Sequence, residues 1–200
     1  MQPAILAYCV LKGGRAKVNG QTYFAGSQVV DQFLPELYAA LGLNYPKFFK
    51  MDNLAKLAFL ATEALLQSVP NPLHANDNVA QFFMNADSSL DTDLVHQAMI
   101  NEHRNVSPSV FVYTLPNILM GEIAIKNKWH GENLFILAPD FNVIDWLNEA
   151  RLLFDLQKAT YCIGGWVNCL NGNYEAKLVL AAAYQPAQIT IETLKDEFAV

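Results

Sequence analysis

The hydrophobic positions of this chain fall into short continuous runs that alternate with longer stretches of helical spacing. Residues 4–11 are almost all apolar and end at Gly13-Gly14, a pattern typical of a strand buried on both faces. Residues 161–169 and 176–184 flank Asn171-Gly172, the usual turn of a β-hairpin. We expect further strands at residues 15–24, 79–84 and 134–137.

Longer stretches between these runs predict helices. Residues 31–43 carry Pro35 near the first turn and Gly42 as a stop. Asp52 precedes the clearest helix, because an aspartate at that position accepts a hydrogen bond from the first turn. The apolar residues of that helix share one face: Leu54, Leu57, Ala58, Ala61, Ala64 and Leu65.

Two more helices are expected in the middle of the chain. Asp91 or Thr92 is expected to cap one over residues 94–99. Pro116-Asn117 opens another, which Gly131 closes. Strands that alternate with helices indicate an α/β fold. We therefore expect a single domain over residues 1–200, with a mixed, mostly parallel sheet, an antiparallel edge and helices on both faces.

The stretch from 141 to about 156 follows Ala138-Pro139-Asp140, which we interpret as a strand-to-helix corner. Its apolar positions cover most of the helix circumference, so we expect this helix to be buried on more than one side. One broad face carries Val143, Trp146, Leu147, Ala150, Leu153 and Phe154, while Ile144, Leu152 and Leu156 fall elsewhere.

Composition narrows the class of protein. Of 200 residues, 52% are hydrophobic and 16% charged, which excludes intrinsic disorder and suggests that a partner covers some apolar surface. The net charge is −6 and the basic residues are scattered, so we expect no nucleic-acid partner. We expect neither a membrane span, which needs about 20 apolar residues, nor a signal peptide. Three cysteines, an odd number, predict buried thiols in the cytoplasm.

Histidine and aspartate patterns do not indicate a metal site. The aspartates near residue 90 lack the glycine and distant glutamate of a calcium loop, so capping explains them more simply. The histidines lack the spacing of metal ligands. The histidines are His74, His96, His103 and His130, and the aspartates are Asp87, Asp91 and Asp93.

Cysteines and glycines have structural interpretations as well. Cys162 and Cys169 fall in an apolar strand with no base nearby in sequence, which favours buried structural thiols. Since no glycine-rich phosphate loop follows a strand, we expect Gly164-Gly165 to allow close backbone packing. We expect no metal and no cofactor.

An ordered series of segments resembles the N-terminal half of β-ketoacyl synthases, which have a thiolase-like fold. The segments are Tyr-Pro-Lys-Phe-Phe-Lys-Met-Asp at 45–52, Ser-Ser-Leu-Asp-Thr-Asp at 88–93, Ser-Pro-Ser-Val-Phe-Val-Tyr-Thr-Leu-Pro-Asn at 107–117, residues 121–125 and 131–134, and Ile-Gly-Gly at 163–165. The resemblance implies a thiolase-like half-fold.

The resemblance also places the family's nucleophilic cysteine at the corner before the buried helix. Here either Pro139 or Asp140 occupies that place, and Asp140 is expected to cap the helix. The family's active-site histidines come from its C-terminal half, which we expect this chain to lack. We therefore predict no catalytic residue and a non-catalytic relative of the condensing enzymes.

Three hypotheses about function stay open. The first is a subunit in fatty-acid or polyketide biosynthesis, as a homodimer or as a heterodimer with a full-length ketoacyl synthase. The second is a small enzyme that acts on acyl or malonyl thioesters near Asp140, with Asn142 beside it. The third is a homodimeric scaffold that binds an apolar small molecule. The predicted interface residues are Phe141, Ile144, Trp146, Leu152 and Leu156.

An acyl carrier protein is a further candidate partner under the first hypothesis. The local basic pairs that could contact an acidic carrier are Lys47 with Lys50 and Lys126 with Lys128. The chain itself is acidic, and this charge disfavours such docking.

Overall fold

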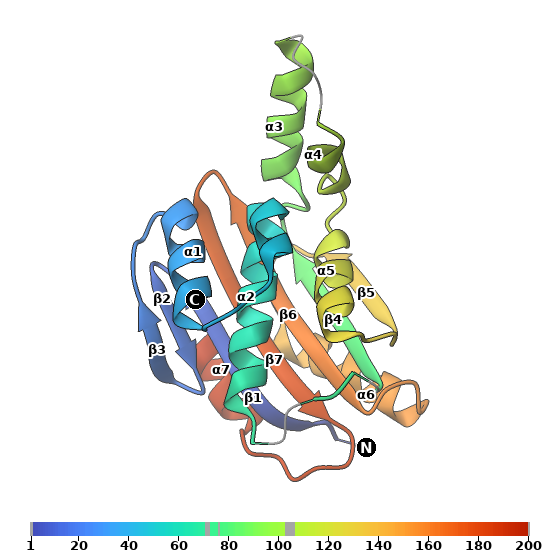
Figure 1. The fold of residues 1–200 in the computed structure, drawn as a ribbon. Helices are drawn as coiled ribbons and strands as arrows, with labels where there is room; N and C mark the ends of the chain where they lie inside the picture. The colour runs from blue at the N-terminus through green and yellow to red at the C-terminus, as the bar shows by residue number, and fades with distance from the viewer. Residues whose placement is uncertain (1, 71–72, 76, 103–106, 200) are drawn as a thin grey trace.

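A seven-stranded mixed sheet forms the centre of the structure, a computed structural model that describes residues 2–70, 73–75, 77–102 and 107–199 (Figure 1). The strand order is β3-β2-β1-β7-β6-β4-β5. The strands are β1 (Ala4–Lys12), β2 (Arg15–Val18), β3 (Gln21–Ala25), β4 (Val79–Asn85), β5 (Asn133–Leu137), β6 (Tyr161–Leu170) and β7 (Asn173–Ala182).

The described strands make four antiparallel and two parallel pairings. Both parallel pairings involve β4, which lies between β5 and β6. The mixed sheet is confirmed, but its parallel part is smaller than predicted, because tight turns connect β1, β2 and β3 and connect β6 to β7. The strand predicted over residues 15–24 is two strands, because Asn19 and Gly20 have φ of 49° and 78° and turn the chain back.

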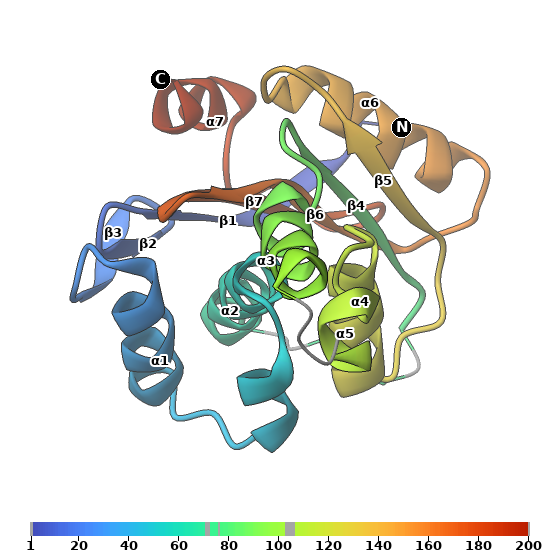
Figure 2. The ribbon, with the colours of Figure 1, turned by 90° about the horizontal axis from the view of Figure 1, so that it is seen from above.

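Helices cover both faces of the sheet, as predicted (Figure 2). One face carries α1 (Val30–Ala40), the short 3-10 helix η1 (Pro46–Lys50), α2 (Asn53–Ser68) and α5 (Ile118–Asn127). The other face carries α6 (Val143–Asp155) and α7 (Ile191–Phe198). Figure 1 shows that α3 (Leu90–Asn101) and α4 (Pro108–Val112) project beyond the end of the sheet.

Helix α2 lies at the centre of the larger core. Asp52 caps it as predicted, with Oδ1 accepting a hydrogen bond of 2.9 Å from the Ala55 N–H. Eleven of its sixteen residues are buried, because it packs against the sheet, α1 and α5 together. On the opposite face, α6 and α7 close a second core that contains Trp146 and Leu194.

Two consecutive glycines let β6 approach its neighbours, which confirms the packing interpretation. A Cβ on Gly164 would collide with the carbonyl oxygen of Phe82 on β4, and one on Gly165 with the carbonyl oxygen of Lys177 on β7. Their φ angles of 143° and 140° lie where other residues are strained. The centre of the sheet therefore requires glycine at both positions.

The bounds of α3 and α5 and the presence of α7 differ from the prediction. Helix α3 begins at Leu90, so Asp91 and Thr92 lie in its first turn and not at its cap. Helix α5 ends at Asn127, because Lys128 adopts a left-handed conformation with φ of 58°. Helix α7 was not predicted, because its short amphipathic pattern buries only Leu194 and Phe198. In the described part of the chain, no helix is both long and apolar enough to span a bilayer.

Candidate functional site

The corner between β5 and α6, residues 138–142, begins at the carboxyl ends of the two parallel strands. The Ala138 N–H donates to the Asn85 carbonyl oxygen at 2.9 Å and extends the pairing of β5 with β4. Asn142 then caps α6, because its Oδ1 accepts a hydrogen bond of 2.9 Å from the Ile144 N–H. The prediction that Asp140 is the cap is wrong. The helix begins at Val143, which leaves Asp140 exposed two residues before the cap.

The corner carries a carboxylate and an amide but no thiol. Pro139 and Asp140 are both exposed and contribute no thiol. A cavity of about 370 Å³ lies beside them, lined by Phe141 and Asn142 from the corner and by Lys195 and Phe198 from α7. Asn142 satisfies an N–H of the first helical turn, so this side chain already occupies a donor that could otherwise hold an anion.

All three cysteine thiols are buried in the sheet, as the structural interpretation predicted. Burial raises the pKa of Cys9 and of Cys162 well above the ordinary range of a thiol. Burial, reinforced by nearby aspartates, raises the pKa of Cys169 to about 12. Since the thiolate is the reactive form, none of the three is a nucleophile at neutral pH.

The residues predicted for an interface divide into two groups. Trp146 is fully buried, and its indole N–H donates to the Phe82 carbonyl oxygen at 2.9 Å, so it belongs to the core of this chain. Phe141 is partly buried against Trp166 and Phe198. Ile144 is also partly buried, whereas Leu152 and Leu156 are exposed. Only the last two offer apolar surface on the outer side of α6.

A further exposed apolar surface, which was not predicted from the sequence, lies along strand β5. This strand is the last in the sheet, and Leu134, Ile136 and Leu137 on it are all exposed. The Gln81 N–H donates to Glu132, and the Ala138 N–H donates to Asn85, so even-numbered residues direct their backbone groups toward β4. The odd-numbered residues therefore direct N–H and C=O groups outward: Asn133, Phe135 and Leu137.

This outward side of residues 133–137, which we call the β5 edge, carries no lysine, proline or bulge. Edge strands of monomeric proteins usually contain such features, because an uninterrupted apolar edge pairs with other strands. The apolar run at residues 134–137 was visible in the sequence, but its place at the edge depends on topology. The β5 edge is therefore a candidate protein–protein interface.

The four lysines considered for carrier binding behave differently from one another. Lys47 forms an ion pair of 2.9 Å with Glu122, and Lys126 one of 2.5 Å with Glu63; both glutamates are buried. Tyr113 also donates to Glu122, at 3.0 Å. These ion pairs connect η1, α2 and α5. Lys50 and Lys128 are exposed.

The described residues do not assemble a metal site. No group of three or more histidine, cysteine, aspartate and glutamate side chains is placed to hold an ion within them. The His96 ring lies beside Phe111, and His103 lies outside the described residues. The aspartates form hydrogen bonds within the protein: Asp87 with Asn168, Asp91 with the Asn171 N–H, and Asp52 with Thr92.

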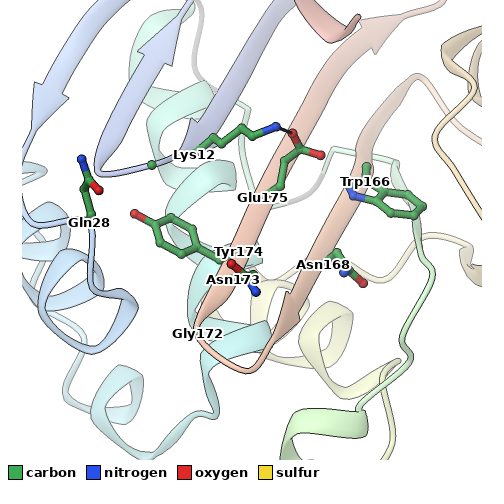
Figure 3. Close-up of a pocket in the computed structure, with 9 residues that line it drawn as sticks. Lys12, Gln28, Trp166, Asn168, Gly172, Asn173, Tyr174 and Glu175 are labelled. Carbon is green, nitrogen blue, oxygen red and sulfur yellow. Dashed lines mark hydrogen bonds and ion pairs between the residues drawn. The ribbon is translucent and has the colours of Figure 1, made fainter. Parts of the chain in front are cut away.

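A polar depression of about 450 Å³ lies at the β6–β7 turn (Figure 3). Glu175 on β7 lies 2.8 Å from the Lys12 ammonium and 3.2 Å from that of the buried Lys177. Burial raises the pKa of Glu175, but the two lysines outweigh burial and the pKa is lowered overall. Trp166 lies near this ion pair in Figure 3. The Glu175 carboxylate is thus shared by two lysine ammonium groups. Its ion pair with Lys12 holds β1 to β7, which gives this cluster a structural role.

Comparison with solved structures identifies the fold. The structure titled the ishigamide ketosynthase/chain length factor superposes with a TM-score of 0.64 at 16% identity, over 94% of this chain and 64% of that one. A β-ketoacyl synthase from Burkholderia phymatum superposes with a TM-score of 0.62 at 10% identity, over 100% of this chain and 61% of that one. The chain has the ketosynthase fold.

A third ketosynthase-fold neighbour matches over more of its own length. It is the structure of the ketosynthase ApeO in complex with its chain length factor ApeC from Xenorhabdus doucetiae. It superposes with a TM-score of 0.61 at 11% identity, over 95% of this chain and 82% of that one. This chain spans less than two thirds of the ishigamide and Burkholderia proteins. No protein-family model matches the sequence, and no curated protein matches it.

Proposed function

We propose that this chain is a non-catalytic ketosynthase-like subunit that pairs with a catalytic condensing enzyme in fatty-acid or polyketide biosynthesis. The observation that carries the proposal is the corner at residues 138–142, where Pro139 and Asp140 stand in a ketosynthase fold without a thiol. The chain's three thiols are buried elsewhere in the sheet. A condensing reaction needs a thiolate to accept the acyl group, so catalysis is assigned to the partner.

The solved neighbours support a partnered role. Two of their titles name a ketosynthase together with a chain length factor. A third names an acyl-carrier protein in complex with its ketosynthase. We extend to this chain the pairing with a ketosynthase. Two of the four candidate lysines already form ion pairs with buried glutamates, which leaves few basic groups for an acidic carrier protein. We therefore propose that a carrier protein binds the assembled complex and not this chain alone.

The β5 edge and the outer side of α6 are the proposed contact with the partner. The β5 edge offers unpaired backbone groups and exposed apolar side chains, and Leu152 and Leu156 extend the apolar surface onto α6. Burial of that surface together with strand pairing would supply the apolar character of a permanent interface, which commonly exceeds about 2,000 Å². A cytoplasmic location stays a prediction from cysteine content.

Co-expression of this chain with each ketosynthase of its source organism tests the proposal. We expect one ketosynthase to purify with it as an equimolar complex, measured by size-exclusion chromatography with light scattering. Leu137→Lys at the β5 edge should raise the Kd at least about tenfold. Tyr23→Lys is the matched control, because Tyr23 is exposed on β3, the strand at the opposite edge of the sheet. This substitution should leave the Kd unchanged.

Intact-mass measurement after incubation with acyl and malonyl thioesters tests the absence of catalysis. We expect an acyl adduct on the ketosynthase and none on this chain. An adduct on this chain, or thioester loss with this chain alone, would support the thioester-enzyme hypothesis and overturn the proposal. A stable homodimer that binds no ketosynthase would support the scaffold hypothesis instead.

A further inference from the structure

A small pocket lies between the start of β5 and the second half of α6. Its volume is about 170 Å³. Apolar side chains from three elements line it, namely Phe82 of β4, Leu134 of β5 and Leu153 of α6. Two acidic residues, Glu132 before β5 and Glu149 on α6, line the same pocket. The pocket therefore combines an apolar lining with two carboxyl groups.

Strand register explains why β5 contributes apolar side chains to this pocket. Leu134 pairs with Phe82, and Ile136 pairs with Met84, and both partners belong to the core that α6 closes. Since residues two apart on a strand share a face, Leu134 and Ile136 both lie on the α6 face of the sheet. They stay 43% and 37% exposed, because α6 packs mainly on β4 and β6 and leaves the last strand open.

Helical spacing connects the pocket with the outer side of α6. Glu149 and Leu153 are four residues apart, so they lie one above the other on the helix. Leu152 and Leu156 follow Glu149 by three and seven residues, and both are exposed. The pocket thus lies between the β5 edge and the exposed leucines of α6, the two surfaces proposed to contact the partner.

The two carboxyl groups of the pocket are unpaired. Within the described residues, neither Glu132 nor Glu149 has a hydrogen-bond or ion-pair partner for its side chain. The one basic residue of α6, Arg151, forms an ion pair of 3.4 Å with Asp155. Two unpaired carboxylates beside one apolar pocket attract a cation and repel an anion. The charge of the pocket therefore disfavours a carboxylate or phosphate ligand.

The size of the pocket favours a single side chain over a free organic ligand. Small-molecule sites commonly enclose about 300–1,000 Å³, well above the volume of this pocket. Lysine and arginine side chains combine an apolar stem with a cationic end. The stem of such a side chain would lie against Leu134 and Leu153, and its cationic end would pair with Glu132 and Glu149.

We propose that this pocket receives a lysine or arginine side chain of the catalytic ketosynthase that pairs with the β5 edge. The inference rests on the proposed function and deepens it, because it names the chemistry by which the partner is recognised. A ketosynthase without a basic side chain at the matching position leaves both carboxylates unpaired beside its own surface. The pocket would therefore favour one ketosynthase over others that share the same fold.

Neutralising the two glutamates tests the pocket separately from the edge. The double variant Glu132→Gln with Glu149→Gln removes both charges at nearly constant volume and should raise the Kd for the co-purified ketosynthase at least about tenfold. The matched control is Glu192→Gln with Asp196→Asn, which removes two exposed carboxylates from α7. Helix α7 lies on the same face but beside β1, three strands away from β5 (Figure 2). The control should change the Kd less than about twofold.

Charge reversal and added salt supply a second readout. Glu149→Lys should weaken binding more than Glu149→Gln, because a lysine repels the incoming cation. Added salt should raise the Kd of the wild-type chain more steeply than that of the neutral double variant, since only the wild-type contact is screened. Circular dichroism of each variant establishes that the fold is kept.

The same measurements distinguish this inference from the proposed function. If the wild-type chain binds the ketosynthase but the neutral double variant binds equally tightly with the same salt dependence, the inference is overturned while the proposed function stands. If the wild-type chain binds no ketosynthase, both fail. If the two glutamates instead hold a homodimer together, a second copy of this chain fills the pocket and the inference is also overturned.

Discussion

Trp146 on α6 and Phe82 on β4 are joined by a hydrogen bond and by stacking. The indole N–H donates to the Phe82 carbonyl oxygen at 2.9 Å, and the two rings are 6° from parallel with centroids 6.5 Å apart. This pair fixes α6 to the sheet directly after the corner. The side chain with the largest apolar surface on α6 therefore stabilises this chain and is not free for a partner.

Trp146→Ala should lower the free energy of unfolding by about 3–5 kcal/mol, because it leaves a cavity and removes the indole hydrogen bond to the Phe82 carbonyl oxygen. Trp146→Phe keeps an aromatic ring and should cost less. Chemical denaturation of the isolated chain measures both. Leu152→Ala is the control on the same helix and should stay within about 0.5 kcal/mol, because that side chain is exposed. Equal effects of Trp146→Ala and Leu152→Ala would contradict this assignment.

Asn142→Ala should destabilise the chain by about 1 kcal/mol, since Ile144 loses the acceptor for its N–H. Asp140→Ala should change stability by less than about 0.5 kcal/mol, because Asp140 is exposed and outside the cap. Thermal unfolding of the two variants side by side distinguishes them. The reverse order would restore Asp140 as the cap.

Gly164→Ala should be strongly destabilising, by more than about 1 kcal/mol, because its Cβ would meet the Phe82 carbonyl oxygen and its φ is unfavourable. Gly121→Ala is a matched substitution in α5, where a Cβ meets no atom within 4 Å. It should stabilise the protein by about 0.5–1 kcal/mol, because alanine favours the helix. Urea midpoints of the two variants should move in opposite directions.

Asp52 predicts an unusual pH dependence. Burial raises the pKa of Asp52 above its ordinary value of 3.8, against the lowering effects of the Thr92 hydroxyl and the Ala55 N–H. The folded chain therefore binds a proton at a pH where the unfolded chain has released it. The contribution of Asp52 to stability is greatest at acid pH and falls as the pH rises through the folded pKa.

Asp52→Asn keeps an acceptor for the helix cap and removes the titration. Its stability relative to wild type should therefore improve as the pH rises from about 4 to about 7. Unfolding free energies of both proteins across that range measure the difference. A constant difference would show that the Asp52 pKa is the same in both states.

Helix caps and turns that depend on a few neighbouring residues were predicted correctly from the sequence. Asp52 was identified as a cap because an N-cap acts within one helical turn, and Asn171-Gly172 was identified as a turn because its conformation is local. Asn19-Gly20 carries the same turn signal, but residues 15–24 were predicted to form one strand. The choice between Asp140 and Asn142 depended on where α6 begins, and both residues are good caps.

Features that depend on the strand order and on packing between elements could not be predicted from the sequence. Residues 134–137 were predicted to form a strand, and only the strand order places that strand at the edge of the sheet. Likewise, Leu152 and Trp146 have similar apolar character, and packing against β4 alone decides which of them faces inward. The candidate interface therefore became visible when the sheet was assembled.

The three buried thiols can report on local opening of the sheet. Cys9 lies in β1, and Cys162 and Cys169 lie near opposite ends of β6, all out of reach of solvent. An alkylating reagent can modify each sulfur only when its strand separates, so labelling rates read out local opening at three separate places. Partner binding at the β5 edge should slow alkylation of β6 more than that of β1, because β4 alone lies between β5 and β6.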